Sequence, residues 1–217
     1  MKVMILAAGR GRRLVPLTDT VPKPMLPVAG KPLIQWQIEA LARAGAKEII
    51  INLHHLGAQI ADHLGDGATF GLAISYSWED QLLETGGGIV NALPFFDDEP
   101  FWLLNGDIWT DFDFATLSRQ LDPPNLAHIV LTPTPAYRDA GDFEFSEGQV
   151  TARGQSYVYC GIALLAPELF HGLTPGHFSL RDVYFDLIAA GALSGQVHPG
   201  QWQDIGTLDE YNAINSA

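Results

Sequence analysis

The stretch Val3-Met4-Ile5-Leu6-Ala7-Ala8-Gly9-Arg10-Gly11 decides the fold expected for this chain. Its first five residues form a short, continuous apolar run, which is typical of a strand buried on both faces of a parallel sheet. The loop that follows, from Ala8 to Gly30, is rich in glycine and proline and has no helical period. Because a loop of that length inside a compact domain is usually functional, the sequence predicts a site directly after its first strand.

The rest of the chain alternates between strand and helix patterns, which favours an α/β fold. We expect a Rossmann-like three-layer α/β/α arrangement with a mixed, mostly parallel central sheet. Ligands in such folds bind beyond the carboxyl ends of the strands, where Gly9, Asn52 and Asp107 fall. Further strands are predicted at 48–53, 72–78, 101–105, 128–131, 143–145, 149–151 and 157–165, with 198–204 irregular or a short strand, and helices at 32–44, 60–64, 86–93, 114–121, 180–190 and 207–214.

Composition narrows the possible functions. The chain has 217 residues with 12 Lys and Arg against 25 Asp and Glu, a formal charge of −13. We therefore expect no general binding of nucleic acid or anionic membranes, both of which need a basic face. The apolar run at the N-terminus is too short for a signal peptide or a membrane span, so a cytoplasmic protein is expected. The single cysteine, Cys160, excludes an intrachain disulfide and is expected to be buried and inert.

Basic residues are concentrated in the glycine-rich loop, although the whole chain is acidic. Glycines can present bare N–H groups to phosphate oxygens, so this concentration predicts a specific site for a small anion. Lys23 lies between two prolines that restrict its backbone, which suits a cation positioned before the reaction. The basic residues of this segment are Arg10, Arg12, Arg13, Lys23 and Lys31.

The loop matches neither of two familiar phosphate-binding patterns. The Walker pattern is absent. The dinucleotide fingerprint needs a small residue where Leu14 stands and a helix that Pro16 and Pro22 disfavour. The loop is therefore expected to bind phosphate in another way.

Three motifs together resemble those of the sugar-1-phosphate nucleotidylyltransferases, also called nucleoside-diphosphate-sugar pyrophosphorylases. They are G-x-G-x-R-L-x-P-x-T…P-K-P from Gly9 to Pro24, the strand end Asn105-Gly106-Asp107, and W-x-D-I-G-T from Trp202 to Thr207. Each motif is weak alone, but their combination is specific and covers almost the whole chain. The resemblance implies one nucleotidyltransferase domain over 1–217, with the nucleotide bound by about 1–110 and the sugar by about 111–217.

The resemblance also implies the reaction and its partners. A sugar 1-phosphate attacks the α-phosphorus of a nucleoside triphosphate in line, and pyrophosphate leaves. Positioning and charge neutralisation lower most of the barrier in such a reaction, and Mg²⁺ is the natural ion. The resemblance assigns Mg²⁺ to Asp107 and Asp204, which must therefore meet in the fold. A monomer is plausible because no dimerisation segment follows Thr207.

Residues in the first half of the chain match the family's nucleotide site. By the resemblance, Arg13 grips the departing pyrophosphate and Lys23 contacts the phosphates around the reacting centre. The planar donor fork of arginine suits two oxygens at once. The whole nucleotide-binding set implied is Leu6, Ala7, Ala8, Gly9, Gly11, Arg13, Lys23, Thr85, Gly86 and Asn105.

Residues in the second half match the family's sugar site. The set implied is Gly141, Glu144, Tyr159 and Gly161. Many family members also carry a Glu-Lys-Pro stretch whose lysine helps to hold the sugar phosphate. This chain has Val150-Thr151-Ala152-Arg153-Gly154 there instead. Either Arg153 or Lys23 could take over that contact.

Three functional hypotheses follow. A uridylyltransferase is favoured, and the same chemistry with another base or sugar, such as a mannose-1-phosphate guanylyltransferase or a glucose-1-phosphate enzyme, is the alternative. A nucleotide-sugar sensor without catalysis is disfavoured, because a sensor would not need Arg13, Lys23 and both aspartates. His54 and His55 lack a third ligand at a zinc-like spacing, so structural roles are expected for them.

Overall fold

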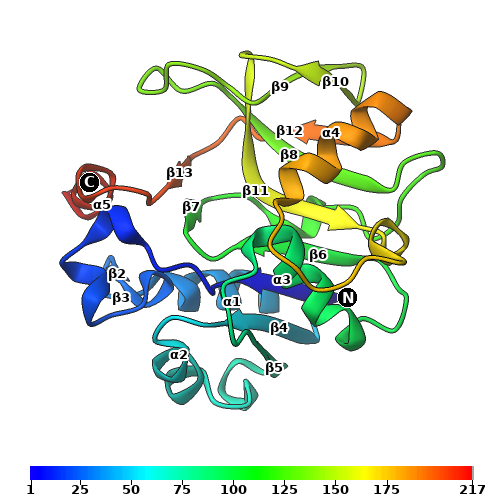
Figure 1. The fold of residues 1–217 in the computed structure, drawn as a ribbon. Coiled ribbons are helices and arrows are strands. Elements are labelled where there is room, and N and C mark those ends of the chain that lie inside the picture. Colours follow the sequence, from blue (N-terminus) through cyan, green and yellow to red (C-terminus); the bar gives the residue numbers. More distant parts are fainter. Residues whose placement is uncertain (217) are drawn as a thin grey trace.

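The computed structural model describes residues 1–216, and a single nine-stranded sheet runs through it (Figure 1). In spatial order the strands are β5 (Ala73–Trp78), β4 (Glu48–Leu53), β1 (Lys2–Leu6), β6 (Phe101–Asn105), β11 (Tyr157–Leu165), β8 (Ala127–Pro133), β12 (Leu193–Val197), β10 (Gln149–Arg153) and β9 (Phe143–Ser146). Three of the parallel strands at one side of the sheet, β1, β4 and β6, are the short apolar runs expected from the sequence.

The sheet changes character in its middle. Strands β5, β4, β1 and β6 are all parallel, with Leu6 of β1 level with Asn52 on one side and Asn105 on the other. Beyond β6, strand β11 runs antiparallel to both of its neighbours, and only the β8–β12 pair is parallel. The mixed sheet expected from the sequence is confirmed, with its parallel part in the first half of the chain.

Helices cover both faces of the sheet, as a three-layer fold requires. Alternate residues of β1 point to opposite faces, so Val3 and Ile5 join one core and Met4 joins the other. The first core lies under α1 (Leu33–Arg43) and α2 (Gly57–Leu64), and the second lies under α3 (Glu84–Ala92) and α4 (Leu180–Ala190). No helix among residues 1–216 is long and apolar enough to cross a membrane.

Two small sheets extend the carboxyl edge of the main sheet. Strand β7 (Ile108–Thr110) follows β6 directly and pairs with β13 (Trp202–Asp204), so that Ile108 lies opposite Asp204. This pairing brings the last motif of the chain beside the end of β6. Helix α5 (Leu208–Ser216) follows β13, and β2 (Pro27–Val28) pairs with β3 (Lys31–Pro32).

Several helix boundaries agree with their sequence signals. Gly45 follows Ala44, the C-cap of α1, and adopts a positive φ of 86°, as glycine at that position often does. Ser179 caps α4, because its hydroxyl accepts a hydrogen bond from Arg181 N at 3.3 Å. Thr207 and Glu210 form the expected capping box at α5, each side chain accepting from the other residue's backbone N–H.

The prediction of a helix at 114–121 is wrong. Only a single 3₁₀ turn, Phe114–Thr116, forms there. Leu117 is extended and its side chain is buried in the first core. The hydroxyl of Ser118 bonds the backbone of Gln120 at both N and O, and such local bonds compete with a helix. Strands β7 and β12 were not predicted, since neither has a clear apolar period.

Candidate functional site

Two cavities of about 290 Å³ each open at the carboxyl ends of the parallel strands, and they share a wall. The first lies against β1 and the glycine-rich loop, and the second lies between β11, α4 and β13. We call them the nucleotide-side cavity and the sugar-side cavity, after the expectations for their residues. The shared wall consists of Thr85, Asn105 and Asp107.

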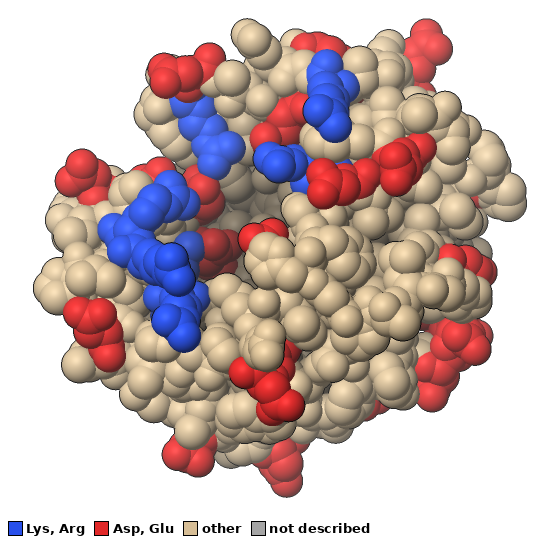
Figure 2. Space-filling view, viewed as in Figure 1, with Lys and Arg blue, Asp and Glu red and all other residues tan. Residues whose placement is uncertain are grey.

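Charge is arranged unevenly around this hollow. Figure 2 shows a depression in the face of the molecule, with lysines and arginines gathered on its rim and acidic side chains inside it. The basic rim stands out because the whole chain carries a formal charge of −13. An anion approaching the hollow therefore first meets the positive charge of its rim.

The nucleotide-side cavity is lined largely by backbone and small side chains. It includes eight of the ten residues expected to bind the nucleotide: Leu6, Ala7, Ala8, Gly9, Gly11, Lys23, Thr85 and Asn105. The Cβ of an alanine at Gly11 would lie 2.9 Å from the Thr18 side chain, and Gly11 has a φ of 60°. Glycine is thus required there both for space and for backbone conformation.

A buried polar chain fixes the walls of this cavity. The side chain of Asn52 accepts from Ala7 N at 2.8 Å and donates to Glu79 Oε1 at 2.7 Å. The other oxygen of Glu79 accepts from Leu83 N at 3.1 Å, just before α3. Asn52 and Glu79 are both buried, so they tie the end of β1 to the start of α3. Asn52 therefore has a positioning role.

Lys23 and Asp107 form an ion pair in the nucleotide-side cavity. The Lys23 ammonium group lies 2.5 Å from Asp107 Oδ2, and only 12% of the lysine side chain is exposed. A short 3₁₀ turn, Lys23–Met25, begins at the lysine directly after the extended residue Pro22. The structure thus joins the glycine-rich loop to the end of β6 by an ion pair.

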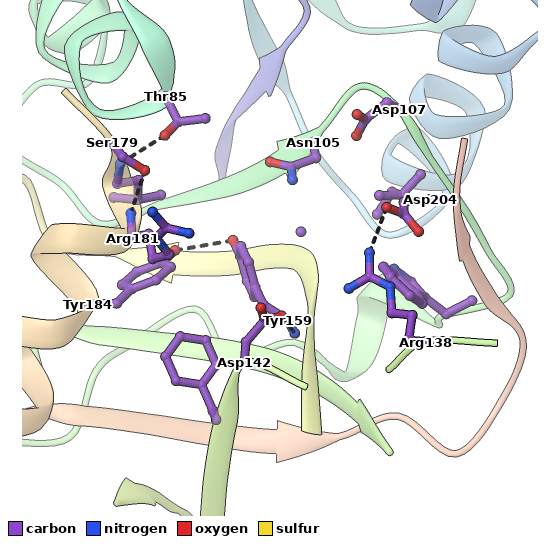
Figure 3. A pocket seen from close by; sticks show the side chains of 15 residues that line it. Thr85, Asn105, Asp107, Arg138, Asp142, Tyr159, Ser179, Arg181, Tyr184 and Asp204 are labelled. Atoms are coloured by element: carbon purple, nitrogen blue, oxygen red, sulfur yellow. Dashed lines mark hydrogen bonds and ion pairs between the residues drawn. The ribbon is translucent and has the colours of Figure 1, made fainter. Parts of the chain in front are cut away.

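Asp204 lies beside Asp107 because of the β7–β13 pairing. Ile205 N donates to Asp107 O at 2.8 Å, and Asp204 is opposite Ile108 in the ladder. Asp204 Oδ2 pairs with Arg138 Nη2 at 2.7 Å. Burial raises the pKa of Asp204, an effect that Arg138 opposes and that Glu210 and Asp107 reinforce. Both aspartates line the sugar-side cavity (Figure 3).

The two aspartates fit a divalent cation. Asp204 Oδ1 is buried and has no hydrogen-bond partner, and a buried carboxylate oxygen without a partner is costly. A cation between the two carboxylates would remove that cost and the repulsion between them. Mg²⁺ needs only one or two protein carboxylates, since phosphate and water supply its other ligands. No cluster of three or more His, Cys, Asp or Glu suited to a metal occurs within residues 1–216.

The sugar-side cavity is lined by side chains from several elements (Figure 3). Tyr184 of α4 is buried and Tyr159 of β11 is partly buried, and their hydroxyl groups lie 3.1 Å apart. Burial raises the pKa of both phenols, so both keep their protons. Gly161 has a φ of 74°, and a Cβ there would lie 2.8 Å from Asn105 Nδ2. That glycine lets β11 approach the shared wall.

Four of the expected site residues lie outside the walls of both cavities. Glycine is required at Gly86 because a Cβ there would meet the Phe178 ring at 2.3 Å, and at Gly141 because one would meet Thr134 Oγ1 at 2.5 Å. Glu144 accepts from Gln155 N at 2.9 Å, and hydrogen bonds to Ser156 and Gln155 lower its pKa. Arg13 is exposed and lies beside Gly206, where a Cβ would be 2.7 Å from its guanidinium.

Three charged residues that line the sugar-side cavity were not predicted: Arg138, Asp142 and Arg181. Arg138 follows β8 in an irregular segment that gives no motif in the sequence. Asp142 directly follows Gly141, one of the expected residues, and its Oδ2 accepts from Tyr159 N at 3.0 Å. Arg153, which the sequence offered as a phosphate contact, lies outside this cavity with its guanidinium carbon 3.3 Å from the centre of the Phe185 ring.

The remaining reactive side chains have structural surroundings. His54 Nδ1 is 2.9 Å from Glu79 O, and His55 Nε2 is 3.0 Å from Thr18 O. Cys160 is fully buried, and burial raises the pKa of its thiol. The low reactivity expected of Cys160 agrees with that environment.

The three-layer fold places the glycine-rich loop and the two aspartates together at the carboxyl edge of the sheet. The family model for nucleotidyl transferases matches residues 2–217, and the chain belongs to this family. An N-acetylmuramate alpha-1-phosphate uridylyltransferase of Neisseria meningitidis serogroup B is 43% identical, with 96% of this chain and 94% of that protein covered.

Two further comparisons agree with this family. An N-acetylmuramate alpha-1-phosphate uridylyltransferase of Caulobacter vibrioides is 32% identical over 94% of this chain and 90% of its own length. The crystal structure of a putative glucose-1-phosphate thymidylyltransferase from Bacillus anthracis superimposes with a TM-score of 0.87 at 22% identity, with 100% of this chain and 94% of that chain covered. The structural likeness confirms the nucleotide-diphospho-sugar transferase type of fold expected from the sequence.

Proposed function

We propose that this nucleotidyl transferase joins UTP and N-acetylmuramate α-1-phosphate to give UDP-N-acetylmuramate and pyrophosphate. The relatives at 43% and 32% identity, both named for this substrate, support the proposal. The observation that carries it is that Asp204 of the sugar-side cavity lies beside Asp107 of the shared wall. Peptidoglycan recycling in the cytoplasm is the role that this reaction would serve.

The reaction requires two polyanions to approach closely. A phosphate oxygen of the sugar 1-phosphate forms a bond to the α-phosphorus of UTP, and the bond from that phosphorus to the bridging oxygen breaks. Pyrophosphate leaves with the electron pair. Residues of about 1–110 hold the nucleotide and residues of about 111–217 hold the sugar, with Thr85 and Asn105 on the shared wall.

Asp107 and Asp204 would hold Mg²⁺, which when bound supplies positive charge to the oxygens of the reacting phosphates. Lys23 contributes a positioned ammonium group at the same place, since it already lies at Asp107. Arg138 takes over the contact that the family's Glu-Lys-Pro lysine makes with the sugar phosphate, because it reaches the sugar-side cavity at Asp204. Arg13, on the exposed side of the loop, contacts the departing pyrophosphate.

The base of the nucleotide contacts backbone groups rather than charged side chains. The segment from Leu6 to Gly9 and the first turn of α3 at Thr85 offer peptide groups and little side-chain bulk in the nucleotide-side cavity. Gly86 supports that turn indirectly, because its N–H donates to Phe178 O at 3.0 Å and so fixes the start of α3 against the segment before α4. Gly141 and Glu144 have the same kind of indirect role on the sugar side, where Asp142, Tyr159 and Gly161 face the cavity.

A pyrophosphate-release assay with Mg²⁺ over a panel of nucleotides and sugar phosphates tests the proposal. We expect UTP with N-acetylmuramate α-1-phosphate to give the highest kcat/KM. Turnover of GTP with mannose 1-phosphate, and none with the expected pair, would show that the base and the sugar are wrong. Nucleotide binding without product from any pair would instead favour a sensor.

A further inference from the structure

Two arginines line the sugar-side cavity, and only one of them is neutralised by a carboxylate. Arg138 pairs with Asp204. Arg181, at the start of α4, is exposed at the edge of the cavity and has no salt bridge within residues 1–216. Figure 3 shows the Arg181 side chain on the α4 side of the cavity, across from Asp107 and Asp204. The wall opposite the expected metal site therefore carries an uncompensated positive charge.

The backbone at Arg181 is firmly anchored. Its own N–H donates to the Ser179 hydroxyl, and the N–H of Leu180 donates to Thr85 Oγ1 at 2.8 Å. The latter bond links α4 to α3 at the shared wall. The remaining carboxylate of the cavity, Asp142, accepts from Tyr159 N and forms no ion pair with Arg181. The guanidinium of Arg181 has its carbon 6.0 Å from the centre of the Phe185 ring but no carboxylate partner within residues 1–216, so its N–H groups can bind an anionic ligand.

The charge of the substrate decides what such a group would bind. The phosphate of a sugar 1-phosphate must lie near Asp107, where transfer occurs, so a neutral sugar would leave Arg181 without a counter-ion. We propose that Arg181 binds a carboxylate carried by the sugar and selects acid-bearing sugar 1-phosphates over neutral ones. This inference rests on the proposed function, because N-acetylmuramate bears a lactyl carboxylate on its ring.

The arginine fork suits this task because it can bind both oxygens of a carboxylate in one plane. Removing charge-assisted hydrogen bonds of this kind at a partly exposed site is expected to lower kcat/KM by about 30-fold. A lysine would keep the charge but lose the paired geometry. Arg181→Lys is therefore expected to retain only part of the selectivity.

The test compares two substrates that differ only in charge. N-acetylmuramate α-1-phosphate and the analogue in which the lactyl group is a primary amide are assayed with UTP and Mg²⁺. The wild type is expected to prefer the acid by about 30-fold in kcat/KM. In Arg181→Gln, kcat/KM for the acid should fall to the value for the amide, while kcat/KM for the amide stays unchanged.

A matched control is Arg153→Gln, since Arg153 also contacts Phe185 but lies outside the cavity. It should keep the wild-type preference. If Arg181→Gln keeps that preference, or lowers turnover of both substrates equally, the carboxylate subsite is wrong while the proposed function stands. If the wild type does not turn over the muramate phosphate, the proposed function fails, and the subsite fails with it.

Discussion

The nucleotide-side cavity is lined by backbone and small residues at the ends of parallel strands, whereas the sugar-side cavity is lined by charged and aromatic side chains from β11, α4 and an irregular segment. Backbone groups bind phosphate and ribose in much the same way in different sequences. Short motifs are therefore enough to predict the residues of the nucleotide-side cavity. Side chains distinguish one sugar from another, and they come from elements far apart in the sequence. The residues that bind the nucleotide and those that select the sugar are therefore expected to lie in different parts of this fold.

Removing the carboxylate of Asp204, which lies beside Asp107 of the shared wall, tests the chemistry common to both cavities. Asp204→Asn should lower kcat by about 10³-fold with the fold retained, because the neutral amide no longer helps to hold a divalent cation. Pyrophosphate release under saturating Mg²⁺ and circular dichroism measure the two parts of this expectation.

A control for that variant is Asp209→Asn, an exposed carboxylate in the first turn of α5. It should keep wild-type turnover. Equal turnover of Asp204→Asn and wild type would remove Asp204 from the metal site.

The sequence predicted the structure best where a strand or loop is formed by one short segment of the chain. The apolar runs of β1, β4, β6 and β11 predicted their strands within a residue or two. The glycine-rich loop and Asp107 could be placed at strand ends for the same reason. The pairing of β13 with β7 was not predicted. The meeting of Asp204 with Asp107, which this pairing produces, was expected only from the family resemblance, since no local pattern specifies a contact between them.

The sugar-side cavity was harder to foresee. Arg138 lies in an irregular segment, and its role depends on an ion pair with a residue 66 positions away. Glu144 had the right residue type but is engaged by the turn before β11, and Asp142 faces the cavity instead. The direction of a side chain at a strand end depends on such contacts, which composition and periodicity do not record.

Arg138→Gln should separate the two cavities in kinetics. Because Arg138 lies in the sugar-side cavity and neutralises Asp204, we expect the KM for the sugar phosphate to rise about 10-fold or more, with little change in the KM for the nucleotide. The control Arg119→Gln removes an arginine that bonds Ala44 O and lies outside both cavities. An equal rise of both KM values in Arg138→Gln would argue against a sugar-side role.

Gly161→Ala should destabilise the wall between the cavities. The new Cβ would lie 2.8 Å from Asn105 Nδ2 at a φ of 74°, and overlap together with backbone strain costs about 2–3 kcal/mol. We expect Tm to fall by about 5–10 °C in a chain of this size. Gly148→Ala has a similar φ of 82° but open space around it, so it should cost about 1 kcal/mol. Equal losses in the two variants would mean that Asn105 can move away.

His128→Gln should produce the smallest effect, because His128 of β8 lines neither cavity. Burial lowers the pKa of His128 against its ordinary value of 6.5, which hydrogen bonding to Gln196 opposes. Between the lowered pKa and 6.5 the unfolded chain binds more protons than the folded chain, so stability is full above pH 6.5 and declines as the pH falls through that window. Urea unfolding at pH 7.5 and pH 5.5 measures the loss of unfolding free energy between the two conditions. This loss should be smaller in His128→Gln than in the wild type, and an equal loss would mean that other groups cause it.

The most direct measurement is anomalous diffraction from crystals grown with Mn²⁺ in place of Mg²⁺ and with UTP. The account predicts a strong manganese peak bound by carboxylate oxygens of both Asp107 and Asp204, with nucleotide phosphate completing its ligands. A manganese ion that contacts neither aspartate, or only one of them while the other stays paired with its basic neighbour, would contradict it.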